Sequence, residues 1–389
     1  MNKVVKDMLR MISLSVVIIF SASNTYAFNV PDSNEKLHEA KNSFIFIFNE
    51  DVPMSRVSAM ASGMAKKHAA TVRTTFKHVL KGFSANISVQ AAARLATNPA
   101  IKYYEQNGVA TITVMPEVTA DKIELNGKPV AILPQSVPYG ISRVGGGIDA
   151  TGKHAWIIDT GIDLDHPDLN VGFGASFVVV RGKVTADDGH GHGTHVAGTI
   201  AAINNDIGVV GVAANATVHP VRVLDENGSG YIDWVLKGID YVAANANAGD
   251  VANMSLSAKG HYQSLHDAIV HTAELGIKFS IAAGNSSDHA DFYEPAHINH
   301  VNVYTISAID ALDIFADFSN YGNPPVDFSA PGVAVTSSKI GGGVLTASGT
   351  SMAAPHVAGL LLLDIEPPLN TGGTAINDPD GNADPIAHY

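Results

Sequence analysis

Short apolar runs alternate with helix-like segments over residues 136–366, and this alternation limits the possible folds most strongly. Continuous apolar runs separated by helices are typical of parallel strands that are covered on both faces. The sequence therefore predicts an α/β fold with a parallel sheet flanked by helices, and roughly 230 residues suffice to bury a full core. The apolar runs are 218–224, 251–256, 279–283 and 301–307, and the helix-like segments are 232–245 and 264–275.

Three glycine-rich runs place an aspartate, a histidine and a serine within this pattern. Asp159 ends the apolar stretch 155–158, His192 stands between two glycines ahead of a helix-like segment, and Ser351 begins an apolar helix-like segment. Attack of a hydroxyl on an amide needs a nucleophile, a base that takes its proton and a carboxylate that orients the base. A serine at a helix N-terminus also has a free backbone N–H beside it. The three runs together favour nucleophilic catalysis.

The histidine run also permits a second interpretation, because it has the residue types of a metal-binding hydrolase motif. The residues concerned are His190, His192, His195, Asp187 and Asp188. The aspartate and serine runs favour the first interpretation, in which His195 is a buried structural residue and His190 an exposed loop residue. A metal-dependent hydrolase that uses these histidines stays an alternative, as does an inactive, inhibited protease-like scaffold.

The order and the neighbours of the three runs resemble the subtilisin family of secreted serine endopeptidases. The runs in question are Asp159-Thr160-Gly161, His192-Gly193-Thr194-His195 and Gly349-Thr350-Ser351-Met352-Ala353-Ala354-Pro355-His356. The resemblance implies a self-processing endopeptidase that hydrolyses peptide bonds through an acyl-enzyme, without a catalytic cofactor. It makes Ser351 the nucleophile, His192 the base and Asp159 the residue that orients the base. Asn285, which ends the strand-like run 279–285, becomes the second oxyanion donor beside the Ser351 N–H.

The resemblance also implies which residues contact a protein or peptide substrate. The strand-like segment 253–256 would line the specificity pocket, and the glycines of 228–230 would let an extended peptide pair with the opposite edge. The implied substrate-binding residues are Ser255, Leu256, Gly228, Ser229, Gly230 and Gly284. Ser257 departs from the family pattern, which often has glycine there, and so does the run 293–295.

The chain has no cysteine, so a secreted form needs another source of stability than disulfides. Calcium is the usual device of the family, and oxygen ligands suit this hard cation. The matching ligands are Gln135, Asp168 and Asn205 by side chain and Ile203, Ile207 and Val209 by backbone carbonyl. An asparagine-rich surface turn at 203–209 is the alternative.

The residues before the catalytic runs divide into a leader and a small domain. Residues 1–27 have a charged start, an apolar core and a small-residue end, which predicts a secretory signal peptide and an extracellular location. After a linker at 28–43, residues 44–114 give a strand-helix-strand-strand-helix-strand pattern, which predicts a small ferredoxin-like α+β domain. This domain resembles the family's propeptide, an inhibitor and folding assistant that is removed by self-cleavage.

The charge distribution supports a two-part precursor. Residues 1–133 carry 15 Lys+Arg and 10 Asp+Glu, a net charge of +5, whereas the remainder carries 9 and 27, a net charge of −18. Opposite charges favour association of the two parts. The strongly acidic remainder argues against nucleic acid or an anionic membrane as partner of the mature form. The family resemblance implies a monomer.

The expected domain boundaries follow from these patterns. Residues 115–134 form a linker with the maturation site; the segment 135–141 resembles a mature N-terminus, which points to cleavage near Leu133 or Pro134, with an earlier bond left open. Residues 135–366 form the catalytic domain. The Gly/Pro/Asp-rich stretch 367–389 is expected to be a tail without regular structure.

Overall fold

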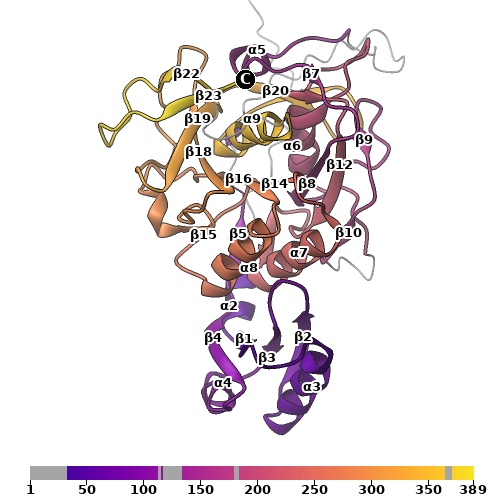
Figure 1. The fold of residues 1–389 in the computed structure, drawn as a ribbon, viewed down its shortest axis with the longest axis vertical. Helices are drawn as coiled ribbons and strands as arrows, with labels where there is room; N and C mark the ends of the chain where they lie inside the picture. The colour runs from indigo at the N-terminus through magenta and orange to yellow at the C-terminus, as the bar shows by residue number, and fades with distance from the viewer. Residues whose placement is uncertain (1–32, 113–114, 117–133, 179–183, 364–369) are drawn as a thin grey trace, which may run out of the picture.

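The computed structural model describes residues 33–112, 115–116, 134–178, 184–363 and 370–389. A small N-terminal unit lies at one end of a larger α/β unit (Figure 1). The predicted signal peptide at 1–27 and most of the predicted linker, at 117–133, lie outside the described residues. None of the helices in the described ranges is long and apolar enough to cross a membrane.

The N-terminal unit is a four-stranded antiparallel sheet in the order β2-β3-β1-β4 with two helices, as the ferredoxin-like prediction requires. In β1 (Ser43–Phe48), every residue is buried because alternate side chains face two different partners. Phe44, Phe46 and Phe48 pack with the helices, whereas Ile45 and Ile47 pack with the larger unit. The other elements are η1 (Met54–Arg56), α3 (Val57–Lys67), β2 (Thr71–Phe76), β3 (Gly82–Asn86), α4 (Val89–Ala96) and β4 (Ile101–Gln106).

The larger unit is built on a ten-stranded sheet whose central strands are all parallel. Its strand order confirms the predicted α/β fold with a parallel sheet. Along the sheet lie β10 (Ala175–Ser176), β12 (Thr217–Arg222), β8 (His154–Asp159), β14 (Val251–Met254), β16 (Lys278–Ala282), β18 (Val303–Ile309), β19 (Val326–Pro331), β23 (Pro385–His388) and β22 (Asn370–Thr374), with β9 (Asn170–Val171) paired to β12.

Helices cover both faces of this sheet (Figure 1). One face packs against α6 (His192–Ala201) and α9 (Thr350–Leu362), and the other against α7 (Ile232–Asn245) and α8 (Gln263–Ala273). In β8, Ile157 joins the first core while Trp156 and Ile158 join the second, so one continuous apolar strand serves both layers. Shorter elements are α5 (Tyr139–Arg143), β7 (Ile148–Asp149), β11 (Ala213–Ala214), β20 (Val335–Ser338) and η2 (Ala290–Phe292).

The C-terminal stretch is part of the main sheet, so the prediction of a tail without regular structure at 367–389 is wrong. Strand β23 pairs in parallel with β19 through Ile386 and Ser329, and β22 adds an antiparallel edge. Ile386 is fully buried, because it packs with Ile309 and Phe315. The Gly/Pro/Asp-rich composition belongs to the turn between the two strands, and a few apolar residues suffice to cover the edge of β19.

The predicted linker at 28–43 is wrong in part, because its middle forms helix α2 (Ser33–Ala40). Ala40 is buried with Tyr231 of the larger unit, and Lys36 forms an ion pair with Asp225. These contacts with the larger unit stabilise the helix, and the composition of the segment alone does not reveal them.

Candidate active site

The three predicted catalytic residues lie at element ends on one edge of the sheet. Asp159 is the last residue of β8, His192 is the first of α6, and Ser351 is the second of α9. Helices α6 and α9 pack side by side on the same face of the sheet. The C-terminal ends of parallel strands and the helices that follow them form the edge where α/β proteins bind their ligands.

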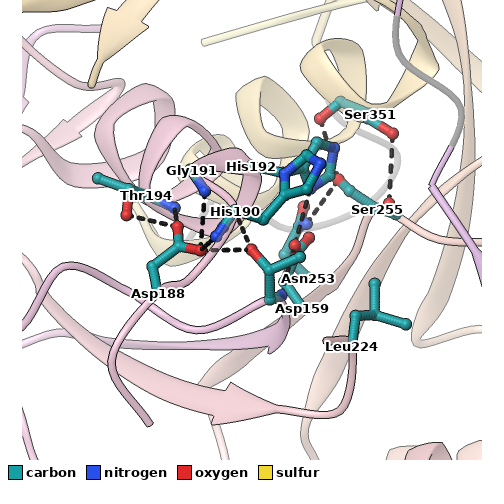
Figure 2. Close-up of polar contacts among 12 residues, drawn as sticks. Asp159, Asp188, His190, Gly191, His192, Thr194, Leu224, Asn253, Ser255 and Ser351 are labelled. Carbon is teal, nitrogen blue, oxygen red and sulfur yellow. Dashed lines mark hydrogen bonds and ion pairs between the residues drawn. The ribbon is translucent and has the colours of Figure 1, made fainter. Parts of the chain in front are cut away.

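Asp159 and His192 form a buried pair, shown in Figure 2. The His192 Nδ1–H donates to Asp159 Oδ1 at 2.7 Å, and both side chains are 0% exposed. The same carboxylate oxygen accepts from the Thr160 N–H at 2.7 Å. Because Asp159 holds the proton on Nδ1, His192 Nε2 is left as an acceptor, and it has no hydrogen-bond partner among the described residues.

Glycine lets α6 lie close to the loop after β8. A Cβ at Gly193 would lie 2.0 Å from the Gly161 carbonyl oxygen, closer than any side chain permits. Gly191, which precedes the helix, has a φ of +103°, a left-handed conformation that glycine adopts without strain. The glycines beside His192 thus allow this ring to meet Asp159.

Asp188 organises the start of α6, a role that the sequence interpretation did not assign. One of its oxygens accepts from the His190 and Gly191 N–H groups at 2.9 Å each, and the other accepts from the Thr194 N–H at 3.0 Å and hydroxyl at 2.6 Å. Thr160 Oγ1 also donates, at 2.9 Å, to the oxygen that accepts from His190 and Gly191. A carboxylate at a helix N-terminus satisfies free N–H groups and favours the helix dipole. An aspartate shortly before a helix start was the available signal.

The other two histidines of the run do not share a binding site with His192. His195 is fully buried, and its Nε2 lies 3.2 Å from the Val335 carbonyl oxygen and 3.0 Å from that of Leu345, which confirms the predicted buried position. Burial lowers the pKa of His195 to about 4. The prediction of an exposed His190 is wrong, because this residue is half-buried, and burial together with the charge of His192 lowers its pKa to about 4.

Ser351 contacts Ser255 through two hydrogen bonds. The Ser351 hydroxyl donates to the Ser255 carbonyl oxygen at 3.2 Å, and the Ser255 hydroxyl donates to the Ser351 carbonyl oxygen at 2.9 Å. The second bond replaces one that the helix cannot make, since Pro355 has no N–H to donate four residues back. In the view of Figure 2 the His192 ring lies between Asp159 and Ser351.

Asn285 is oriented by the residue before Ser351. Its Oδ1 accepts from the Thr350 N–H at 2.8 Å and from the Thr350 hydroxyl at 3.0 Å. The amide oxygen is thus engaged by Thr350. Gly284 has a φ of +106°, and a Cβ there would lie 2.4 Å from Asn320 Nδ2, so glycine is needed for the turn that presents Asn285.

The two predicted substrate-binding edges enclose a segment of the chain itself. Strand β5 (Val109–Thr111) pairs antiparallel with β13 (Ser229–Tyr231), so that Ala110 faces Gly230. On its other side Thr111 and Ser257 exchange two backbone hydrogen bonds, which continues the segment that holds Ser255 and the buried Leu256. The Ile112 N–H then donates to the Gly228 carbonyl oxygen at 3.0 Å.

The chain is paired again a few residues later, with the strand that ends shortly before Ser351. Strand β6 (Met115–Pro116) pairs antiparallel with β21 (Val344–Ser348), and Met115 faces Ser348, three residues before the serine. The backbone is therefore paired as extended chain at 109–112 and again at 115–116. Only residues 113 and 114 separate the two paired segments.

The predicted calcium ligands converge on a buried carboxylate. Asp168 accepts from Asn205 Nδ2 at 2.8 Å and from the Val209 N–H at 3.1 Å, and Gln135 Nε2 lies 2.7 Å from the Ile203 carbonyl oxygen and 3.2 Å from that of Val209. Ile207 joins this group of hydrogen bonds through its N–H, which donates to Asn205 Oδ1 at 2.7 Å.

Comparison with known proteins gives the class of this site. A serine at a helix N-terminus, beside a buried Asp–His pair on a parallel sheet, is one of the known arrangements of serine hydrolases. Residues 156–367 match the Subtilase family. Because this match spans more than half of the chain, and several relatives agree with it, the chain belongs to the subtilase family and is a serine endopeptidase of the subtilisin type.

The relatives cover most of the chain. Alkaline protease of Alkalihalobacillus alcalophilus is 35% identical over 84% of this chain and 81% of its own, and subtilisin E of Bacillus subtilis is 35% identical over 79% and 77%. Alkaline serine exoprotease A of Vibrio alginolyticus is 36% identical over 78% of this chain, which spans 55% of that protein's length. A crystal structure of a cold-adapted subtilisin-like serine proteinase aligns with a TM-score of 0.57 and 34% identity, over 64% of this chain and 97% of that one.

Proposed function

We propose that this protease is made as a secreted precursor that cleaves its own N-terminal unit and then hydrolyses protein and peptide substrates as a monomer. One observation carries the proposal: the chain's residues 109–112 pair with the segment at β13, and its residues 115–116 pair with β21, the strand that ends shortly before Ser351. An extended backbone in this position is held as a substrate would be. The proposed signal peptide at 1–27 supplies the export step.

The proposed chemistry is that of an Asp-His-Ser triad. Ser351 Oγ attacks the substrate carbonyl carbon while His192 Nε2 takes the hydroxyl proton, and the buried Asp159 stabilises the resulting imidazolium. His192 then gives this proton to the leaving amine, the C–N bond breaks and an acyl-enzyme remains. A water molecule, deprotonated by His192, attacks the ester carbonyl carbon; His192 then returns the proton to Ser351 Oγ as the acyl C–O bond breaks, which releases the acid and restores the serine. Asn285 Nδ2 and the Ser351 N–H donate to the oxyanion that forms at both stages.

The proposed maturation bond is Thr113–Val114. It is the central bond between Ile112, the last residue paired before the serine, and Met115, the first residue paired after it. Ser351 is therefore proposed to attack within the two residues that separate the paired segments. We propose this bond in place of the expected cleavage near Leu133 or Pro134. It is an earlier bond of the kind that the sequence analysis left open.

The N-terminal unit is proposed to remain as an inhibitor after cleavage. Asp240 of α7 is fully buried beneath it and accepts from three consecutive N–H groups, the nearest being that of His78 at 2.6 Å. Arg73 pairs with the buried Asp233 at 2.6 Å. Charge-assisted hydrogen bonds of this kind are stronger than neutral ones, and they do not depend on the cleaved bond.

A structural calcium ion is proposed at Gln135, Asp168, Ile203, Asn205, Ile207 and Val209. Burial raises the pKa of Asp168 to about 6, and no Lys, Arg or His in the described ranges forms an ion pair with it. A hard dication would compensate this buried carboxylate. Binding requires the Gln135 amide to turn so that Oε1 faces the carbonyl oxygens. The ion would tie the segment at Gln135 to the loop 203–209.

Calcium is tested on the Ser351→Ala chain, which cannot digest itself. Removal of calcium with a chelator should lower the midpoint of thermal unfolding, and re-addition should restore it. Asp168→Asn should abolish this calcium dependence, whereas Asp165→Asn, at a neighbouring exposed aspartate, should keep it. Equal calcium dependence in the two variants would reject the site.

The function is tested by the intact mass and N-terminal sequence of the wild type and of Ser351→Ala, both expressed from residue 28. The wild type should lose its N-terminal unit and begin at Val114, and Ser351→Ala should stay at full length. If both chains are processed alike, or neither is, self-cleavage by Ser351 is rejected. A serine-directed phosphonofluoridate separates the alternatives, because it silences a serine protease and leaves a metal-dependent hydrolase active.

A further inference from the structure

Two histidines and a glutamate that take no part in the Asp159–His192 pair converge in the larger unit. They are His261, Glu294 and His297, and one ligand atom from each lies within 4.8 Å of the other two. Within the described ranges this is the one group of three or more such side chains gathered closely enough to hold a metal ion. The His261 and His297 rings are 4.7 Å apart between centroids, and His297 Nδ1 lies 3.1 Å from Glu294 Oε1.

The backbone fixes the positions of these ligands. Strand β15 (Ala258–Lys259) pairs antiparallel with β17 (Tyr293–Glu294), so that Ala258 faces Glu294. The Gly260 N–H donates to the Phe292 carbonyl oxygen at 2.9 Å. His261 follows directly on this paired segment, and His297 follows three residues after Glu294. The ligands therefore come from two segments that are already held together.

Glu294 is a buried carboxylate with one oxygen that is unsatisfied among the described residues. Its side chain is 1% exposed, its single ion-pair partner in the described part of the chain is His297, and its Oε2 has no hydrogen-bond partner there. An ionised carboxylate that is buried with an unsatisfied oxygen is costly unless a cation compensates it. The unsatisfied oxygen is the observation, independent of the clustering, that indicates a ligand.

The donor set selects the class of ion. Two imidazole nitrogens and one carboxylate oxygen suit zinc and related divalent transition metals, whereas calcium prefers oxygen ligands alone. His261 is exposed, so an ion can enter from solvent and keep a water molecule in the open position. A further imidazole, His266, has its Nδ1 3.4 Å from His297 Nε2 and can hold that ring in place as an outer partner.

We propose that His261, Glu294 and His297 bind a zinc-class divalent ion that links the loop after β15 to the segment after β17. The linked loop follows Ser257, which pairs with Thr111. The ion would therefore brace one of the two edges that hold an extended peptide. Its binding is independent of the catalytic serine and of maturation.

The test uses the full chain with Ser351→Ala, freed of metal and then titrated with zinc sulfate in excess calcium. It should bind one zinc ion that calcium does not displace. The additional substitution His261→Ala removes an exposed ligand, and we expect it to weaken this binding by at least about tenfold. His38→Ala, which removes an exposed histidine outside the group, serves as the matched control and should bind zinc unchanged.

Two further readouts keep the test decisive. Zinc should raise the midpoint of thermal unfolding of the control variant and leave that of His261→Ala unchanged. Cobalt, used as a coloured substitute, should give the intense visible absorption of a tetrahedral site in the control alone. Absence of a zinc site in the Ser351→Ala chain, or equal zinc affinity in the two histidine variants, would overturn the proposal and leave the protease function untouched.

Discussion

Thr111 and Ser257 exchange two backbone hydrogen bonds of 2.9 Å each, across the junction between the N-terminal unit and the catalytic unit. This pair fixes the register of the strand that approaches Ser351. A shift by one residue would turn the side chains of 109–112 to the opposite faces and break the pairing with β13. The position of the bond proposed for cleavage is thus set by pairing at some distance from the bond itself.

The first prediction concerns this bond. Thr113→Pro should slow self-cleavage by at least about tenfold, because proline removes an N–H that an extended substrate backbone donates and restricts the preceding residue. Leu133→Pro, the same change at the position that the sequence first suggested, should leave the rate unchanged. Rates are measured by intact mass over time, and a slow Leu133→Pro chain beside a normal Thr113→Pro chain would move the bond to the later position.

The second prediction concerns the buried carboxylate. Asp159→Asn should reduce the rate constant of self-cleavage by about 10⁴-fold, the order of loss known from other serine proteases, because the imidazole loses its orientation and its counter-charge. The exposed Asp165 provides the control, and Asp165→Asn should cleave at the wild-type rate. A loss below about tenfold in Asp159→Asn would show that His192 acts without this partner.

The third prediction concerns inhibition by the N-terminal unit. Asp240→Asn removes the charge that accepts from the N–H groups of 77–79, so we expect the mature enzyme to bind its cleaved N-terminal unit about 10- to 100-fold more weakly. Activity of the mature enzyme on a short peptide should not change. Asp317→Asn, at an exposed aspartate, is the control for a general loss of negative charge. Equal inhibition constants for Asp240→Asn and the unsubstituted enzyme would show that Asp240 does not contribute to binding of the N-terminal unit.

The fourth prediction concerns pH and the C-terminal strand. Burial raises the pKa of Asp384 from 3.8 to about 6, although Ser307 and Ser329 donate to its Oδ2. The unfolded chain therefore releases this proton at lower pH than the folded chain, and the stability that the neutral carboxyl contributes below pH 4 is lost as the pH rises to 6.

Asp384→Asn keeps the shape and removes the charge. We expect it to increase the free energy of unfolding by about 3 kcal/mol at pH 7 and to flatten its dependence between pH 4 and 6. The measurement is urea unfolding of the Ser351→Ala chain at a series of pH values. Asp380→Asn, an exposed neighbour, should follow the unsubstituted chain. If the free energy of unfolding of Asp384→Asn depended more steeply on pH than that of the unsubstituted chain, the assignment of a raised pKa to Asp384 would be wrong.

Local patterns explain what the sequence could predict. Helix α7 (Ile232–Asn245) has the predicted bounds, and Asp159, His192 and Ser351 stand at the predicted element ends, because apolar periodicity and glycine signals act over a few residues. The register of β5 against β13 depends on residues more than a hundred positions apart, so no local pattern reveals it. The order of the C-terminal strand likewise depends on the open edge of β19, which only the assembled sheet presents.

The pairing of two segments of the chain with strands of the same molecule has a kinetic consequence for the proposed self-cleavage. Residues 109–112 and 115–116 are paired with the same molecule's β13 and β21, so the bond between them needs no diffusional encounter to reach Ser351. Under the proposed self-cleavage, the first turnover of each molecule is therefore unimolecular. Its rate constant will stay the same on dilution, whereas cleavage of one molecule by another would slow in proportion to the protein concentration.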